Sequence, residues 1–224
     1  MKKICTLITA FLLVTTLQAQ KSGSIISKIT MGVDIFNDFV QDSPSDINFR
    51  TINPGVNVYG MYNYPVPKSN ISLAIGLGLG MHNLHSNGIL SESSGISILT
   101  PYPDYLNQKN INYKKNKLQL TYLDIPAEIR YKSEGGFRLA LGIKAGYLLG
   151  AHTKFKGDDP ATGIGTKIKQ SKIANLEQWR FGPTFQIGYK YINFTAFYSL
   201  TTVFDKTKAP DIYPISLGIA LRPF

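Results

Sequence analysis

Three histidines are the first residues in the chain whose type and spacing could support chemistry. His82 and His85 form an H-x-x-H pattern, and His152 follows in a later segment. Zinc sites need three or four histidine, cysteine or carboxylate ligands. No cysteine or clustered carboxylate joins these histidines, and the segment around them lacks a helical period. We therefore expect histidines at a polar rim and no metal site.

Two other combinations deserve a test against known chemistry. His82 or His85 near Ser86, Ser91 or Glu92 is the one place for a serine–histidine–acid arrangement of the kind that cleaves or transfers acyl groups. These residue types meet in many loops, so their proximity in sequence carries little weight. The segment Gly157-Asp158-Asp159-Pro160 offers carboxylates for calcium but lacks the further spaced oxygens of a binding loop. It is predicted to form a turn.

Lysines dominate the charge of the chain. The net charge is +10, and it falls to +8 without Lys2 and Lys3. Much of the excess comes from nine lysines in two segments: Lys109, Lys114, Lys115, Lys117, Lys154, Lys156, Lys167, Lys169 and Lys172. No RNA- or DNA-binding motif accompanies them, so the predicted partners are anionic lipid headgroups and polysaccharide, and no nucleic acid. The alternative is that these lysines are simply solvated in loops.

The first residues resemble a secretory signal peptide. Lys2 and Lys3 form a basic start, an apolar run covers residues 4–17, and Leu17-Gln18-Ala19 is a small-residue cleavage site. The alternative is a short buried helix or a membrane anchor. We expect residues 1–19 to be removed and residues 20–224 to form one domain. Cys5 is the single cysteine, so that domain would hold neither thiol nor disulfide.

The elements that position the charged residues are predicted as β-strands. In LAIGLGLGMH, residues 73–82, large apolar residues alternate with Ala74, Gly76, Gly78 and Gly80. A dinucleotide-binding loop needs a different glycine spacing, and a transmembrane helix needs about 20 apolar residues. A two-residue period is typical of a strand. One face of this strand is apolar, and the other carries almost no side chains.

The same alternation recurs in seven further segments. They cover residues 122–131, 136–150, 179–191, 192–200 and 212–224, with weaker candidates at about 25–36 and 52–64. Long and short connections take turns between them, with long loops at about 83–116 and 151–175. This asymmetry is typical of outer-membrane barrels, which have short periplasmic turns and long outer loops. An even strand number would place both termini in the periplasm.

The predicted fold is all-β: an eight-stranded antiparallel up-and-down transmembrane β-barrel in the outer membrane. A secreted soluble barrel is the alternative, but it would turn the uncharged small residues of 72–80 toward water, whereas small residues suit a narrow barrel interior. Aromatic residues near both strand ends predict two interfacial girdles. The short-turn girdle comprises Tyr62, Tyr64, Tyr131, Phe137, Tyr189 and Tyr191, and the long-loop girdle comprises Tyr122, Tyr147, Trp179, Phe204 and Tyr213.

The signal peptide, the segment YLDIPAEIRY at 122–131 and the final Phe224 resemble the PorT-like outer-membrane β-barrel family of Bacteroidota. The resemblance implies an eight-stranded barrel in the outer membrane, and it implies no single activity. One departure concerns the barrel-assembly signal, which usually keeps the last phenylalanine in phase with the outward residues. Here the outward residues from Tyr213 to Leu221 are out of phase with Phe224.

Charged residues at inward positions are predicted to form a network in the lumen. Its members are Asp124, Glu128, Arg130, Arg138, Lys144 and Arg180. A hairpin centred on Glu134 would place Asp124 opposite Lys144, and Glu128 diagonal to Arg138. Such charges need partners in a narrow lumen, because breaking a buried ion pair costs about 3–5 kcal/mol. The alternative is that the side chains reach rim water separately.

Together these features predict a non-enzymatic structural or accessory protein of the cell envelope, able to join a larger outer-membrane complex. Its partners would be outer-membrane lipids and lipopolysaccharide, with no cofactor. A diffusion porin is disfavoured because side chains fill an eight-stranded barrel. The alternative is a lipid A-modifying outer-membrane enzyme that uses His82 or His85.

Overall fold

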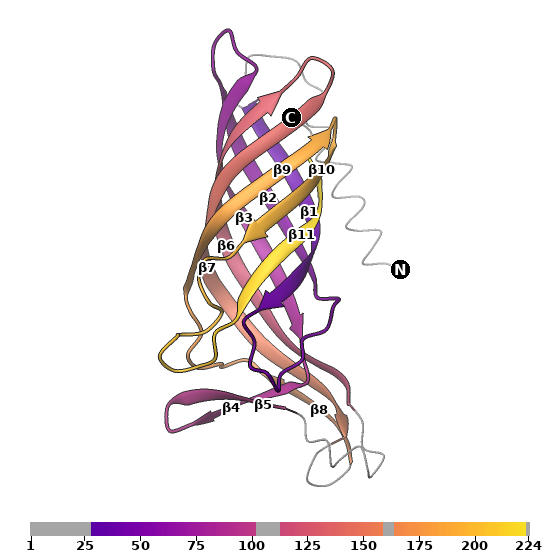
Figure 1. Cartoon of the computed structure of the whole chain (residues 1–224), viewed down its shortest axis with the longest axis vertical. Helices are drawn as coiled ribbons and strands as arrows, with labels where there is room; N and C mark the ends of the chain where they lie inside the picture. Colours follow the sequence, from indigo (N-terminus) through magenta and orange to yellow (C-terminus); the bar gives the residue numbers. More distant parts are fainter. Residues whose placement is uncertain (1–27, 102–112, 159–163, 223–224) are drawn as a thin grey trace.

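Eight strands of the computed structural model close into a barrel, and three more lie at one end of it (Figure 1). The structure describes residues 28–101, 113–158 and 164–222. The barrel strands are β1 (Ile29–Gln41), β2 (Pro54–Pro65), β3 (Ile71–His85), β6 (Tyr113–Lys132), β7 (Phe137–Asp158), β9 (Trp179–Tyr189), β10 (Ile192–Tyr198) and β11 (Tyr213–Leu221). All neighbours pair antiparallel, β1 pairs with β11, and β6 pairs with β7. The predicted fold class is therefore confirmed.

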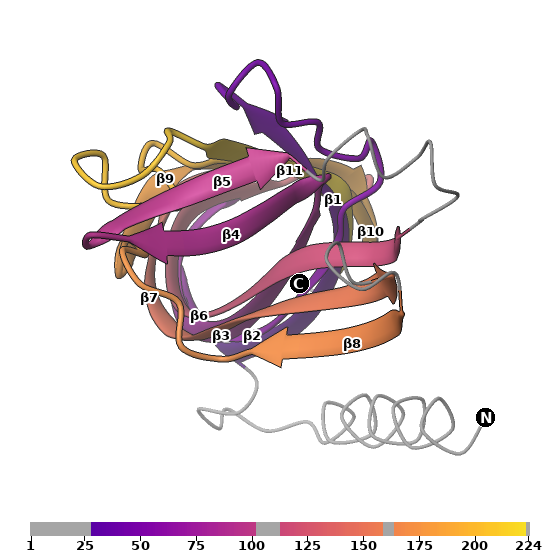
Figure 2. The same ribbon diagram turned by 90° about the horizontal axis from the view of Figure 1, so that it is seen from below.

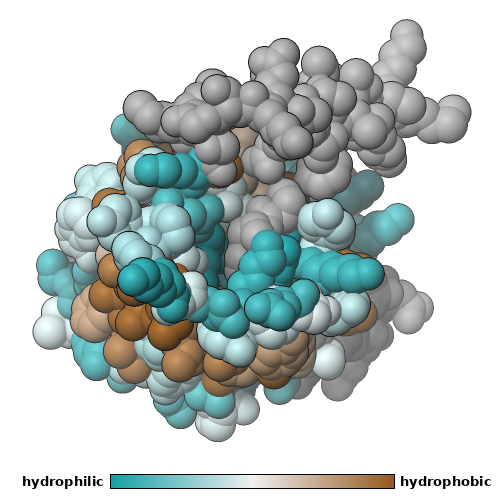
Figure 3. All heavy atoms as spheres, turned by 90° about the horizontal axis from the view of Figure 1, so that it is seen from above, coloured by the Kyte–Doolittle hydropathy of each residue, from teal (hydrophilic) through white to brown (hydrophobic). Residues whose placement is uncertain are grey.

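The alternation in the sequence sorts side chains between lipid and lumen. On β3 the exposed fraction of Leu77 is 60%, whereas that of Ala74, on the opposite face, is 5%. A Cβ on Gly76 would collide with the carbonyl oxygen of Gly60 on β2, so the bare face lets neighbouring backbones approach closely. We call the outward apolar residues of β3 from Ile71 to Met81, and their counterparts on the other strands, the apolar belt. Figure 3 looks onto the short-turn end and shows hydrophobic residues gathered along one flank of the molecule.

The aromatic girdles are partly as predicted. Tyr64, Tyr189 and Tyr191 are exposed at the short-turn end, and at the other end Tyr147 and Trp179 stand 4.9 Å apart between ring centroids. Tyr122 and Phe204 were wrongly assigned to the outer surface, since both are buried. Tyr122 shares the inward phase of β6, and Phe204 lies in a loop that bridges to Leu176.

The predicted register of the β6–β7 hairpin is wrong by two residues. Tyr131 pairs with Leu139, which centres the turn on Gly135 and not on Glu134. Gly136 has φ of 90°, a left-handed conformation that favours glycine, and the amide of Gly136 donates to the carbonyl of Ser133. The shift places Asp124 opposite Gly146 and not opposite Lys144.

The barrel extends well beyond the apolar belt at its long-loop end. β6 has 20 residues and β7 has 22, about twice the 9–11 residues that a strand needs to cross a bilayer. β8 (Gly165–Gln170) pairs with the outer part of β7, and β4 (Gly88–Ser93) pairs with β5 (Ile96–Pro101) as a hairpin across the end (Figure 2). Much of the two regions predicted as long loops is therefore strand. Among the described residues, no helix is long and apolar enough to span a membrane.

Candidate functional site

Glu128 is the centre of the charge cluster nearer the short-turn end of the lumen. Its Oε2 accepts hydrogen bonds from Arg222 Nη1 at 2.6 Å and from Arg130 Nε at 2.8 Å. Arg222 Nε also donates to the Tyr59 hydroxyl at 3.0 Å, and that hydroxyl donates to Asp34 Oδ1 at 2.7 Å. These hydrogen bonds thus join strands β1, β2 and β6 to the residue after β11 across the lumen.

Asp124 is the centre of a second cluster, nearer the long-loop end. Arg180 Nη2 donates to both of its carboxylate oxygens, at 2.9 and 3.0 Å, and Lys144 Nζ lies 4.0 Å from Oδ2. The Arg180 guanidinium stands over the Tyr122 ring at 3.8 Å, and Lys144 Nζ stands 3.8 Å from the Phe197 ring centroid. Each cation therefore has both an anionic partner and an aromatic face.

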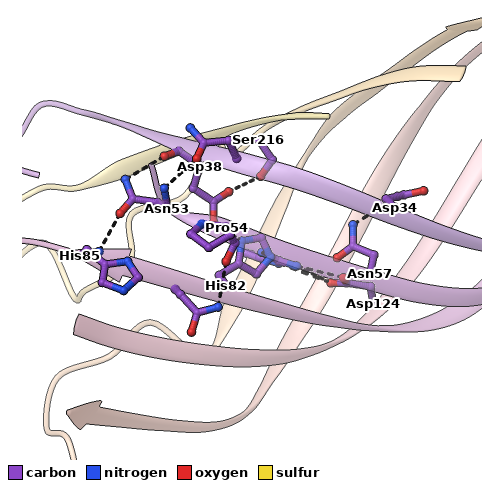
Figure 4. Close-up of polar contacts among 12 residues, drawn as sticks. Asp34, Asp38, Asn53, Pro54, Asn57, His82, His85, Asp124 and Ser216 are labelled. Atoms are coloured by element: carbon purple, nitrogen blue, oxygen red, sulfur yellow. Dashed lines mark hydrogen bonds and ion pairs between the residues drawn. The ribbon is translucent and has the colours of Figure 1, made fainter. Parts of the chain in front are cut away.

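His82 lies in the lumen, so the prediction of a rim position was wrong for this residue. Its Nδ1 is 2.8 Å from Asp38 Oδ2 (Figure 4). Its Nε2 is 2.7 Å from Arg180 Nη1. Because arginine can only donate, Nε2 accepts, and the ring proton sits on Nδ1 and is donated to Asp38. Ser216 Oγ donates to Asp38 Oδ1 at 2.6 Å and makes no bond to His82. With Nε2 occupied by Arg180, this histidine cannot act as a base toward a serine.

The other predicted members of the lumen network are buried too. Arg130, Arg138 and Lys144 have exposed fractions of 1%, 5% and 7%. Arg138 donates to the carbonyl oxygen of Arg222 at 2.9 Å and does not lie diagonal to Glu128. Sequence reasoning missed Arg222, although it shares the inward phase of Ser216 and Ala220 on β11.

Side chains close the lumen to solutes. A cavity of about 40 Å³ lies among residues such as Asp34, Asn57, Glu128 and Lys144, and another of about 10 Å³ lies beside His82 and Arg180. A single water molecule needs about 10–15 Å³ of cavity volume. These spaces hold a few water molecules at most, which fits a narrow barrel filled by its own side chains.

The outer extension carries six lysines in two rows on the outward face of β6, β7 and β8. In the inner row, Lys154 of β7 pairs directly with Lys117 of β6 and with Lys169 of β8. In the outer row, Lys156 pairs with Lys115 and Lys167. Within the described parts of the chain, none of the six lies within 4 Å of a carboxylate. Like charges directly opposite one another destabilise a sheet.

The positive charge of the rows lowers the pKa of ionisable groups beside and within them. Burial lowers the pKa of His152, and the charges of Lys169, Lys117 and Lys154 lower it further. Burial and the charges of Lys115 and Lys154 likewise hold the pKa of Lys117 below its ordinary value. Lys117 finds only neutral partners, Asn83 and Gln119, whose amide oxygens accept from its Nζ.

Of the remaining predicted lysines, the two that lie in the described residues do not join the rows. Lys114 is exposed in a bulge of β6, and Lys172 follows β8 beside a groove at the outer end. Lys109 lies outside the described residues, as do the predicted signal peptide, Phe224 and part of the 157–160 segment.

The predicted serine–histidine–acid candidates are not assembled into a site. Ser86 Oγ accepts from the amide of Gly88, while Ser91 and Glu92 are exposed on β4. His85 pairs with Lys117, and its Nδ1 is buried without a hydrogen-bond partner. In the portion of the chain that the structure covers, no group of three His, Cys, Asp or Glu residues is placed to hold a metal ion.

Comparison with solved structures finds barrels of low similarity. Ail, the attachment invasion locus protein of Yersinia pestis, is 12% identical over 87% of this chain and 97% of its own, with a TM-score of 0.38. Ail in complex with the heparin analogue sucrose octasulfate has a TM-score of 0.37 at the same identity and coverage. A triple-mutant porin of Rhodopseudomonas blastica is 8% identical over 87% of this chain and 99% of its own, with a TM-score of 0.22.

Sequence comparison gives a clearer result. No curated protein matches the chain. Residues 18–205 match the model of a family described as "Outer membrane protein beta-barrel domain". This match covers most of the eleven strands, including both clusters of lumen charges except Arg222. The chain therefore belongs to the outer membrane β-barrel domain family.

Proposed function

We propose that the protein is a non-enzymatic accessory barrel of the PorT-like type that binds the phosphates of lipopolysaccharide at its outer rim. Its two termini would lie in the periplasm, because the start of β1 and the end of β11 are at the same end as the short turns. The observation that carries the proposal is the pair of lysine rows on β6, β7 and β8. An anion bound across the rows would neutralise charges that otherwise repel one another.

The height of the rows suits a lipid headgroup. Met81 is the last belt residue of β3, and His85, four residues further, pairs with Lys117. At roughly 3.3 Å per residue, the inner row lies about 13 Å along the strand from the edge of the belt. A strand tilt of about 40° reduces this to about 10 Å in height. Phosphates just above the hydrocarbon layer would lie within reach of lysine side chains.

The closed lumen supports a structural role over transport or catalysis. Paired charges fill the interior, and the imidazole of His82 is held between Asp38 and Arg180. The competing proposal, a lipid A-modifying enzyme, predicts a change in the acyl chains of lipid A after incubation with the purified protein. Mass spectrometry of that lipid A decides between them, since any such change would overturn the non-enzymatic role.

Variants of the inner row test lipid binding. Lys154→Gln with Lys169→Gln removes two charges, each worth about 1 kcal/mol toward an anionic surface, so affinity should fall roughly twentyfold or more. The measurement is lipopolysaccharide retained by the purified barrel, quantified by mass spectrometry at low and high salt. A matched control, Lys68→Gln with Lys132→Gln, makes the same charge change at exposed positions of the short-turn end.

Equal retention by the row variant and the wild type would refute the proposed binding surface. Equal loss in both variants would show that net charge and not the rows matters. A pulldown from mildly solubilised outer membranes tests the accessory role, because an accessory barrel should recover the same partner proteins in repeated preparations. Recovery of the barrel alone would count against membership of a larger complex.

A further inference from the structure

A cavity of about 280 Å³ lies at the outer end of the barrel, inside the extension formed by β6, β7 and β8. Its lining is mostly apolar and comes from elements far apart in the sequence. The main contributors are Leu84, Leu90, Leu99, Leu118, Phe155 and Ile168. An empty apolar cavity of 150 Å³ in another protein is large enough to bind benzene, so this one can hold a larger apolar group.

The floor of the cavity separates it from the charged lumen. Leu84, Phe204 and Ile212 line the cavity and belong to a buried cluster with Leu120 and Tyr122. Tyr122 in turn stands against Arg180, which begins the layer of lumen charges. A molecule in the cavity therefore meets hydrocarbon on its inner side and has no passage into the barrel.

The β4–β5 hairpin forms a wall of the cavity and is held in place by the outer loops. Leu90 and Leu99 of the hairpin face the cavity. Ser97 Oγ donates to the carbonyl of Ala174 at 3.1 Å, and Asn175 Nδ2 donates to the carbonyl of Gly95 at 2.9 Å. These bonds fix the hairpin across the barrel end seen in Figure 2, so the cavity is preformed.

Polar groups at the cavity identify the kind of headgroup that would accompany an apolar chain. The amide nitrogen of Asn116 is already occupied by the carbonyls of Ser86 and Gly88. Lys117 is the one charged residue among the described residues that line the cavity, and its Nζ is turned toward Asn83 and Gln119 on the outward face of the same strands. The electrostatic field at the cavity wall is therefore positive, and it complements an anionic headgroup.

We infer that this cavity binds the alkyl chain of a single-chain anionic amphiphile, such as a medium-chain carboxylate, that arrives from the external medium; the external source rests on the proposed orientation of the barrel. A bilayer lipid is a poorer occupant, because the cavity lies inside the extension beyond the apolar belt. Its chain would have to leave the bilayer and pass the charged rows. The inference does not require lipopolysaccharide binding, because the row side chains lie on the outward face, the cavity lies on the inward face, and Lys117 is the one described residue that belongs to both.

A chain-length series tests the cavity directly. The barrel is placed in nanodiscs of neutral lipid, and carboxylates from hexanoate to dodecanoate are titrated by calorimetry against empty nanodiscs. Each added methylene should raise affinity about fourfold while it still enters the cavity. Affinity should then level off when the cavity is full. A rise without a plateau would indicate partition into lipid and would overturn the inference.

Neighbouring residues on β5 provide a matched pair of variants. Leu99→Trp fills the cavity, whereas Ile98→Trp adds the same side chain on the opposite, exposed face. We expect at least a tenfold loss of decanoate affinity for Leu99→Trp and an unchanged affinity for Ile98→Trp. Both variants should retain lipopolysaccharide, which separates this result from a failure of the proposed function. The gel-mobility shift checks that both variants are folded. Equal decanoate affinities of two folded variants would overturn the inference.

The headgroup and the source of the chain are tested separately. Decanoate should bind more tightly than decanol at low salt, and added salt should reduce this advantage. Equal affinity at every salt concentration would contradict the anionic headgroup. Native mass spectrometry of barrels released from nanodiscs then compares the lipids bound to the wild type and to Leu99→Trp. We expect no diacyl lipid that is bound to the wild type and missing from the variant. Such a lipid would show that the cavity takes its chain from the membrane and would contradict the assigned occupant.

Discussion

Glu128 in the lumen and Lys154 in the outer extension occupy opposite electrostatic settings. Glu128 lies between two cations, Arg130 and Arg222. Lys154 lies between two further cations, Lys117 and Lys169. The difference separates charges that are paired with one another in the lumen from charges that oppose one another on the outer extension, where we propose that an anion binds.

The cause of the difference is the surrounding medium. Inside the barrel an unpaired charge would lie in a poorly hydrated space, so every charge there needs a partner. On the extension the lysines contact water, and repulsion between exposed like charges costs only tenths of a kcal/mol to about 1 kcal/mol. The structure can therefore tolerate the rows at a small cost, which the proposed binding of an anion would offset.

Removing a lumen carboxylate should have the largest effect. Glu128→Gln leaves the guanidinium groups of Arg130 and Arg222 without their shared anion and should lower the free energy of unfolding by about 3–5 kcal/mol. Urea unfolding in lipid vesicles measures this, and the temperature of the gel-mobility shift should fall as well. Glu134→Gln, in the exposed β6–β7 turn, is the control. A loss below 1 kcal/mol would remove the contrast with the outer rows.

Removing a row lysine should have a smaller effect of the opposite sign. Lys154→Gln relieves repulsion from Lys117 and Lys169 and should raise the free energy of unfolding by about 0.2–1 kcal/mol in the absence of lipopolysaccharide. The same urea experiment measures it, with Lys68→Gln as a control for net charge. A destabilised Lys154→Gln barrel would mean that the lysine is held by favourable contacts.

The smallest effect should appear in the titration of His152. Lys169→Gln removes one of the charges that depress the pKa of His152, so this pKa should rise toward its ordinary value of about 6.5. NMR titration of the imidazole measures the change, and Lys132→Gln should leave it unaltered. In the wild type the unfolded chain takes up this proton more readily, so stability should decline slightly as the pH falls through the folded pKa. An unchanged pKa would show that the charge of Lys169 does not contribute to it.

The two-residue period was enough to predict the barrel, the lipid-facing residues and the inward phase of residues such as Asp124 and Arg180. It did not fix the β6–β7 register, because the left-handed conformation at Gly136 moves the centre of the turn by one residue. His82 shares the inward phase of Gly80, but its place near a predicted long loop led to the wrong assignment.

The lysine rows and the cavity were beyond sequence reasoning. They depend on the pairing of β8 with β7 and on the β4–β5 hairpin across the barrel end. A local sequence period does not predict how strands from different long connections are arranged relative to one another. The nine lysines were recognised as two basic segments. The direct opposition of six of them became visible only with the pairing of β6, β7 and β8.

The position of Arg222 has a consequence for the order of assembly. Arg222 comes directly after the last strand, yet it contacts Glu128 on β6 and Tyr59 on β2. These two contacts of Arg222 can therefore form only after β11 has paired with β1 and the barrel is closed. In a chain without Arg222, the Glu128 carboxylate is paired with Arg130 alone. A truncated or half-inserted barrel therefore lacks the ion pair that forms only in the closed barrel.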